Sequence, residues 1–303
     1  MTSRTDVVGG SADGLVAVRR RVADFAALGK PRVVLMVVLT TLVGYYLGAG
    51  RELDYLRLVH LLVGTALAAG GTLAFNQLLE RDVDACMLRT RRRPLPDGRL
   101  QPGEAAAFAA LLGVGGLAYL VLGVGVACAA VTAATAALYL GVYTPLKRVS
   151  PLCTVLGAVP GALPPVAGWV AARDELGVGA AVLFGILFLW QLPHTLAIAR
   201  LYADDYARAG IRVLPVVDAG GGSTERQIVA GCLALHAAGL LPTLIGLTGA
   251  TYFFGALALG AGFLACGLVQ AFRPSAAAAR RLVLASVVYL PLLLALMALD
   301  KVG

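Results

Sequence analysis

The sequence predicts an all-α polytopic membrane protein, and three observations support that fold class. Of the 303 residues, 59% are hydrophobic and 14% are charged, whereas a soluble domain carries about 25% charged residues. The mean hydropathy is +0.83. Apolar runs of about 20 residues, the length of one spanning helix, recur along the chain. They are rich in Ala, Gly, Leu and Val and lack the alternation of β-barrel strands.

Nine membrane spans can be placed on the apolar runs. The stretch from Ala105 to Tyr143 is too long for one helix and is divided near Gly123. Pro274 and Ser275 mark a turn between the last two spans. The predicted spans are roughly 33–50, 58–79, 105–122, 124–143, 152–171, 177–198, 228–247, 251–271 and 281–299.

The distribution of positive charge predicts the orientation of these spans. With the N-terminus in the cytoplasm, 21 Lys and Arg residues fall on the inside and four on the outside, as the positive-inside rule requires. The net charge of +8 therefore reflects topology rather than a nucleic-acid partner. We expect a multi-pass protein of the cell membrane with a disordered cytoplasmic tail at 1–22 and a membrane domain at 23–303. The polar N-terminus lacks a signal-peptide pattern.

The end of the second span carries the first candidate site. Asn76, Glu80 and Asp84 are spaced i, i+4 and i+8, so on a helix their side chains line one face. Oxygen ligands of this kind suit Mg²⁺, which takes further oxygens from substrate phosphates. Asp82 points away from that face. The alternative is that these acids only balance the neighbouring arginines at a cytoplasmic helix end.

Basic residues on the same side of the membrane supply partners for phosphate oxygens. The guanidinium groups of Arg89 and Arg93 have the fork geometry that matches phosphate. Two further pairs lie at span ends, where topogenic charge is the simpler explanation of each. These pairs are Lys30 with Arg32, and Lys147 with Arg148 after Tyr143. Together the acids and bases predict a cytoplasm-facing site for a metal and a diphosphate.

A second acid cluster lies in the long loop after the sixth span. His194 and Asp205 fall on one predicted helical stripe, with His194 about 16 Å deeper at 1.5 Å per residue. A histidine at that depth faces a cavity or partner, or bonds to a backbone carbonyl. Asp204 and Arg208 look like a surface pair, which leaves Asp205 as the functional candidate. Both acid clusters face the same side and could close over one cavity.

The residues of these two loops resemble a known family. The N-x3-E-x3-D pattern at Asn76, Glu80 and Asp84 is similar to the first acid-rich motif of the UbiA-type intramembrane prenyltransferases. The resemblance sharpens to the branch that farnesylates protohaem IX. Its marks are the M-x-R-T-x-x-R-P string from Met87 to Pro94 and DDYARAG at 204–210. The resemblance covers nearly the whole chain beyond residue 23.

This resemblance implies a fold and an activity. The fold is a nine-helix bundle around a central cavity. The activity is farnesyl transfer from farnesyl diphosphate to a vinyl group of protohaem IX (haem B), with water supplying a hydroxyl. Asn76, Glu80 and Asp84 would bind Mg²⁺-diphosphate, Asp205 would contribute from the second motif, and His194 is a hypothetical haem contact. A haem A synthase is a candidate partner.

The chain departs from the family pattern at several positions. Glu80 replaces the more general Asp, Thr195 stands where an aromatic residue is usual, and the short 218–227 loop has a run of glycines. The second cluster also lacks a full D-x-x-x-D. Two other functions compete with haem farnesylation. One is prenylation of an aromatic or quinone precursor, and the other is membrane transport, which leaves both acid clusters without a role.

Overall fold

The computed structural model describes residues 6–50, 52–218, 220 and 222–302, and this part of the chain is almost entirely helical. Within it, nine helical stretches are long and apolar enough to cross a membrane, which confirms the predicted number. They are Pro31–Gly48, Tyr55–Leu79, Pro102–Gly123, Val126–Leu146, Cys153–Arg173, Val178–Leu201, Gly222–Leu244, Ala250–Phe272 and Ala276–Leu299. The orientation of these spans across the membrane stays a prediction.

Several spans are composed of more than one helical segment. The fourth joins α6 to the π-helix η1 and to α7, the fifth joins α8 to α9, and the seventh joins α13 to α14. The helices of the spans are α2 (Pro31–Gly48), α3 (Tyr55–Leu79), α5 (Pro102–Gly123), α6 (Val126–Ala137), η1 (Leu138–Tyr143), α7 (Thr144–Leu146), α8 (Cys153–Ala162), α9 (Pro164–Arg173), α10 (Val178–Leu201), α13 (Gly222–Ala238), α14 (Leu241–Leu244), α15 (Ala250–Phe272) and α16 (Ala276–Leu299).

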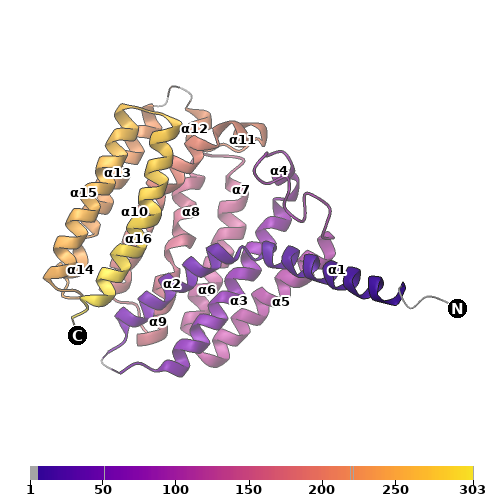
Figure 1. The fold of residues 1–303 in the computed structure, drawn as a ribbon. Coiled ribbons are helices and arrows are strands. Elements are labelled where there is room, and N and C mark those ends of the chain that lie inside the picture. The colour runs from indigo at the N-terminus through magenta and orange to yellow at the C-terminus, as the bar shows by residue number, and fades with distance from the viewer. Residues whose placement is uncertain (1–5, 51, 219, 221, 303) are drawn as a thin grey trace.

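The N-terminal segment differs from the expectation of a disordered tail at 1–22. Residues 6–28 form α1 (Asp6–Leu28), which projects from the side of the bundle in Figure 1, and residues 1–5 lie outside the described residues. Its C-terminal part is attached to α5, because Arg21 pairs with Glu104 and the Phe25 and Phe108 rings lie 5.1 Å apart. The C-terminal part of α1 is therefore held by contacts with α5, which is distant in sequence.

The fifth span is broken, as its prolines and glycines suggest. Pro164 begins α9 directly after α8 has ended, because proline cannot donate the backbone hydrogen bond of a continuous helix. Glycines allow α9 to approach α2 closely. A Cβ at Gly44 would lie 2.0 Å from the Pro165 carbonyl oxygen, and one at Gly168 would lie 2.0 Å from that of Thr41.

The short helices that carry the acid clusters gather at one end of the bundle. These are α4 (Arg81–Ala85) and α11 (Ala203–Arg208), and the acid-free α12 (Leu214–Val217) lies with them near α7 at the upper end in Figure 1. A buried apolar cluster joins them: Val83 and Met87 pack with Cys153, Ile211 and Val213. The two acid-bearing loops therefore pack against each other and cover this end of the bundle.

Candidate functional site

Asn76, Glu80 and Asp84 follow one another along a nearly continuous helical path. Although α3 ends at Leu79, the backbone N–H of Glu80 donates to the Asn76 carbonyl at 3.0 Å, and the N–H of Asp84 donates to Glu80 at 2.7 Å. Asn76 and Asp84 are each 1% exposed, whereas Asp82 is exposed and pairs with Arg81. The predicted single face is therefore present, and it is turned inward.

Each residue of this face is bonded to a basic side chain. Lys30 Nζ donates to Asn76 Oδ1 at 3.3 Å, and Lys147 Nζ lies 2.7 Å from Glu80 Oε1. Arg93 lies 2.7 Å from Asp84 Oδ2. The amide of Asn76 also donates to Thr144 Oγ1 at 3.1 Å. An amide from α3, acids from the α3–α4 junction and from α4, and bases from three other segments thus meet at one place.

Burial and neighbouring charge shift the pKa of both lysines. For Lys30, desolvation and then the positive charges of Arg93 and Lys147 lower the pKa to about 8. For Lys147, desolvation is the largest single effect and acts downward, but the charge and hydrogen bond of Glu80 together with Tyr139 and Tyr206 outweigh it, so the pKa lies above its usual value. Lys147 is therefore firmly cationic, whereas Lys30 is cationic only below about pH 8.

The string from Met87 to Pro94 folds around Asp84. Thr90 Oγ1 donates to the Asp84 carbonyl at 2.9 Å, and Arg93 reaches its carboxylate. Met87 and Thr90 are buried, at 4% and 1% exposed. The segment from Met87 to Pro94 is thus a loop whose buried residues fix the position of Asp84.

Asp205 joins the second acid cluster to this loop. Its carboxylate oxygens accept hydrogen bonds from the backbone N–H groups of Leu88 and Arg89, each at 3.3 Å. Arg208 pairs with Asp205 rather than with Asp204, so the predicted Asp204–Arg208 surface pair is wrong. The correction follows from burial: Asp205 is 7% exposed and faces inward, while Asp204 faces solvent.

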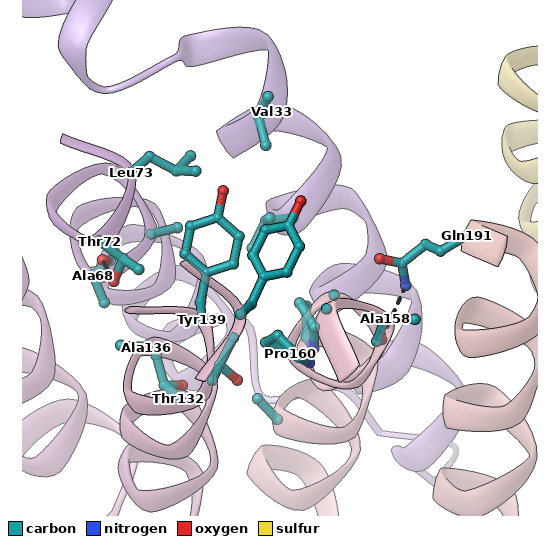
Figure 2. Close-up of a pocket in the computed structure, with 18 of the residues that line it drawn as sticks. Val33, Ala68, Thr72, Leu73, Thr132, Ala136, Tyr139, Ala158, Pro160 and Gln191 are labelled. Atoms are coloured by element: carbon teal, nitrogen blue, oxygen red, sulfur yellow. Dashed lines mark hydrogen bonds between the residues drawn. The ribbon is translucent and has the colours of Figure 1, made fainter. Parts of the chain in front are cut away.

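An apolar cavity of about 250 Å³ lies directly below the polar cluster. Figure 2 shows Tyr139 on its wall with the hydroxyl directed toward Val33, which lies three residues from Lys30. Tyr143 also lines the cavity, and Lys147 Nζ lies 4.3 Å from its ring centre. Seven threonines contribute to the wall: Thr41, Thr65, Thr72, Thr132, Thr135, Thr154 and Thr195.

Four predicted site residues lie apart from the buried cluster. Arg32 and Arg148 are exposed at the same end of the bundle, and Arg89 is exposed with its guanidinium 5.0 Å from the Tyr202 ring centre. His194 is turned toward α16, where Nδ1 lies 2.6 Å from Ser286 Oγ and its ring stacks on Trp190. His194 is not among the residues that line the cavity, although Gln191 and Thr195 are.

Thr144 and Tyr139 belong to the site but do not appear among the sequence predictions. The spacing of Thr132, Thr135 and Tyr139 places polar groups on one face of an apolar span, and this signal could have revealed the wall. The π-helix that follows is less accessible from sequence. It turns Tyr139 and Tyr143 into the cavity, and such π-segments are frequent at functional sites.

The donor set fits a hard cation that takes most of its ligands from phosphate. Asn76, Glu80 and Asp84 supply oxygens only, as Mg²⁺ prefers. Within the described residues, no group of three or more His, Cys, Asp or Glu side chains could hold a metal unaided. The three basic partners could turn from the acids to phosphate oxygens. The residues present are therefore compatible with Mg²⁺ and a diphosphate together.

A family model and several known proteins are similar to this chain over most of its length. A family model described as the UbiA prenyltransferase family matches residues 37–295. The chain is 46% identical to a protein named protoheme IX farnesyltransferase from Solibacter usitatus, covering 92% of this chain and 99% of that protein. A protein of the same name from Aquifex aeolicus is 37% identical, covering 93% and 96%.

Solved structures share the fold at much lower identity. A structure described as a digeranylgeranylglyceryl phosphate synthase has a TM-score of 0.77 at 16% identity and covers 93% of this chain and 98% of its own. A UbiA homolog from Archaeoglobus fulgidus, bound to GPP and Mg²⁺, has a TM-score of 0.65 at 16% identity, covering 90% and 99%. Such likeness establishes the architecture of the bundle.

Proposed function

The chain belongs to the UbiA prenyltransferase family, and from that premise we propose that it transfers farnesyl from farnesyl diphosphate to a vinyl group of haem B. One observation carries the assignment. The buried Asn76–Glu80–Asp84 face and its basic partners stand at the mouth of an apolar cavity. Substrate identity follows the curated relatives, which are named for this reaction at 37–46% identity.

The reaction balances without a redox partner. The bond between farnesyl C1 and oxygen breaks, and diphosphate leaves with the electron pair. The vinyl π electrons of haem attack the allylic cation and form a carbon–carbon bond. Water then adds to the resulting cation and loses a proton, which gives haem O. An apolar cavity delays the entry of water until the carbon–carbon bond has formed.

The residues of the site divide these tasks. Lys30, Lys147 and Arg93 would bind the phosphate oxygens and stabilise the departing charge. Exposed Arg89 would contact the diphosphate from outside. Tyr139 and Tyr143 line the wall below and would contact the first isoprene unit. The carboxylates hold these cations in place before the substrate arrives.

Mg²⁺ would be held by Asn76, Glu80 and Asp84, and when bound it would neutralise the diphosphate as a leaving group. The choice of this metal is supported by the oxygen-only donor set of the helix face. Asp205 would act through the 88–89 backbone. The excess of Lys and Arg on this side of the bundle supports a site that faces the cytoplasm from the cell membrane.

The acceptor is tested by a direct comparison. Purified protein is incubated with farnesyl diphosphate and Mg²⁺, together with either haem B or 4-hydroxybenzoate, and products are identified by mass. We expect haem B to gain one farnesyl group and one water, with 4-hydroxybenzoate unchanged. Prenylation of 4-hydroxybenzoate alone would assign the chain to an aromatic acceptor. If neither haem B nor 4-hydroxybenzoate is prenylated, both functions are rejected.

A further inference from the structure

We propose that Thr41 of α2, Thr65 of α3 and Thr132 of α6 form the floor of the cavity and limit the length of the prenyl chain. This inference rests on the proposed function, because it concerns the donor of that reaction. All three threonines line the same cavity. They come from three different spans, so they can close it from three sides.

The three threonines lie at one depth. Thr41 is eleven residues from Lys30, Thr65 is eleven from Asn76, and Thr132 is eleven from Tyr143. Lys30, directly before the first of these spans, and Asn76 belong to the polar cluster at the mouth, and Tyr143 at the top of the wall contacts Lys147 of that cluster. At 1.5 Å per residue the floor is therefore about 16 Å below the mouth. Figure 2 shows Thr132 at the far end of the wall from Val33.

Closely packed side chains lie beneath the floor of the cavity. One helical turn beyond the threonines are Tyr45, Leu61 and Cys128, which are 2%, 0% and 1% exposed. These three side chains belong to one buried apolar cluster with Leu120 and Val124. A chain that reaches the threonines therefore meets packed side chains and can go no further without a rearrangement of the core, which is costly.

This depth matches a farnesyl chain. Three bonds of an extended chain cover about 3.5 Å, so the twelve-carbon main chain of farnesyl reaches roughly 14 Å. By the same measure geranyl reaches roughly 9 Å and geranylgeranyl roughly 19 Å. Farnesyl fills the space between mouth and floor, geranyl leaves its lower part empty, and geranylgeranyl exceeds it.

The hydroxyl groups do not prevent contact with an apolar chain. Those of Thr41 and Thr132 donate within their own helices, to the carbonyls of Val37 at 2.8 Å and Cys128 at 3.0 Å. Thr65 Oγ1 is buried and has no hydrogen-bond partner. Thr65 is therefore the floor residue at which the effects of side-chain volume and polarity can be separated, since Val has almost the same shape as Thr but no hydroxyl.

The test measures donor preference in the full-length protein. Thr65→Phe adds four heavy atoms, close to the five of one isoprene unit, and Thr65→Val is the matched control. We expect Thr65→Phe to raise the ratio of kcat/KM for geranyl over farnesyl diphosphate at least tenfold, with haem B as acceptor. Thr65→Val should leave this ratio within twofold of the wild-type value.

The opposite change checks the same floor by removing volume. The double variant Thr65→Ala with Thr132→Ala loses four heavy atoms and should raise geranylgeranyl over farnesyl preference at least tenfold. Unchanged ratios in active variants would overturn the floor while leaving haem farnesylation intact. If Thr65→Phe does not fold, the double variant decides alone. If the wild-type protein does not prenylate haem B with geranyl, farnesyl or geranylgeranyl diphosphate, the proposed function itself is rejected.

Discussion

The Asp205 carboxylate of α11 accepts a hydrogen bond from the backbone N–H of Arg89, 3.3 Å away and 116 positions earlier in the chain. It accepts another from Leu88. A buried carboxylate engaged with two N–H groups and with Arg208 has little free capacity for a metal. We propose from this geometry that Asp205 acts as a positioning residue for the loop that carries Arg89 and Arg93.

The first prediction concerns that positioning role. Asp205→Asn should raise the KM for farnesyl diphosphate about tenfold, because the weaker acceptor loosens the loop, while the Mg²⁺ concentration giving half-maximal rate stays unchanged. Steady-state assays with varied diphosphate and varied metal separate the two effects. The exposed neighbour Asp204→Asn is the control. A large shift in the metal requirement would make Asp205 a ligand instead.

A second prediction separates structure from chemistry at the Glu80–Lys147 pair. Each side chain is 14% exposed, and the atoms are 2.7 Å apart. Removing one partner of a buried pair costs about 3–5 kcal/mol, so Glu80→Gln or Lys147→Gln should lower thermal stability. The double variant should recover most of the stability, because no charge remains unpaired.

Activity should behave differently in the same three variants. If Glu80 and Lys147 act on the diphosphate, the double variant stays inactive even though its melting temperature recovers. The comparison requires thermal unfolding and kcat/KM on the same preparations. Recovery of both stability and activity would show that the pair is structural only.

A third prediction addresses the close packing of α2 on α9. Gly44→Ala would place a methyl group 2.0 Å from the Pro165 carbonyl oxygen, and overpacking of this kind lowers the free energy of unfolding by about 1–3 kcal/mol. Gly185→Ala on α10 is the control, since nothing lies within 4 Å of its added Cβ. Equal melting temperatures for the two variants would argue against the observed contact.

The fourth prediction concerns Asp218, which accepts a hydrogen bond from the backbone N–H of Ser223 at 2.8 Å. This bond lowers the pKa of Asp218 below its usual value. A depressed folded-state pKa stabilises the protein above the unfolded value of about 3.9, and the effect disappears as pH falls through the folded value. Asp218→Asn should therefore lower the melting temperature at neutral pH, with the difference closing in acid. A constant difference at all pH values would contradict this.

Much of the fold could be predicted from the sequence because it depends on local composition. The nine spans follow from hydropathy, and the single face of Asn76, Glu80 and Asp84 follows from helical spacing. The break between α8 and α9 follows from proline chemistry. These features depend on residues that are close together in the chain.

The remaining features depend on partners that are distant in sequence. Asp205 finds its partners in backbone N–H groups, which carry no residue identity, so no pattern reveals them. The sequence locates His194 by depth alone, and depth does not distinguish the cavity from α16. The helical state of 6–22 accompanies contacts between α1 and α5 that composition does not indicate.

The most direct single test compares Asp84 with Asp82, two aspartates on one short helix. Asp84 is buried and bonded to Arg93, while Asp82 is exposed. The measurement is kcat/KM for farnesyl transfer to haem B, with folding of both variants checked by thermal unfolding. If the inward face activates the diphosphate, Asp84→Asn lowers kcat/KM at least a hundredfold and Asp82→Asn changes it less than twofold. Equal, small effects of the two substitutions would contradict a catalytic role for the face.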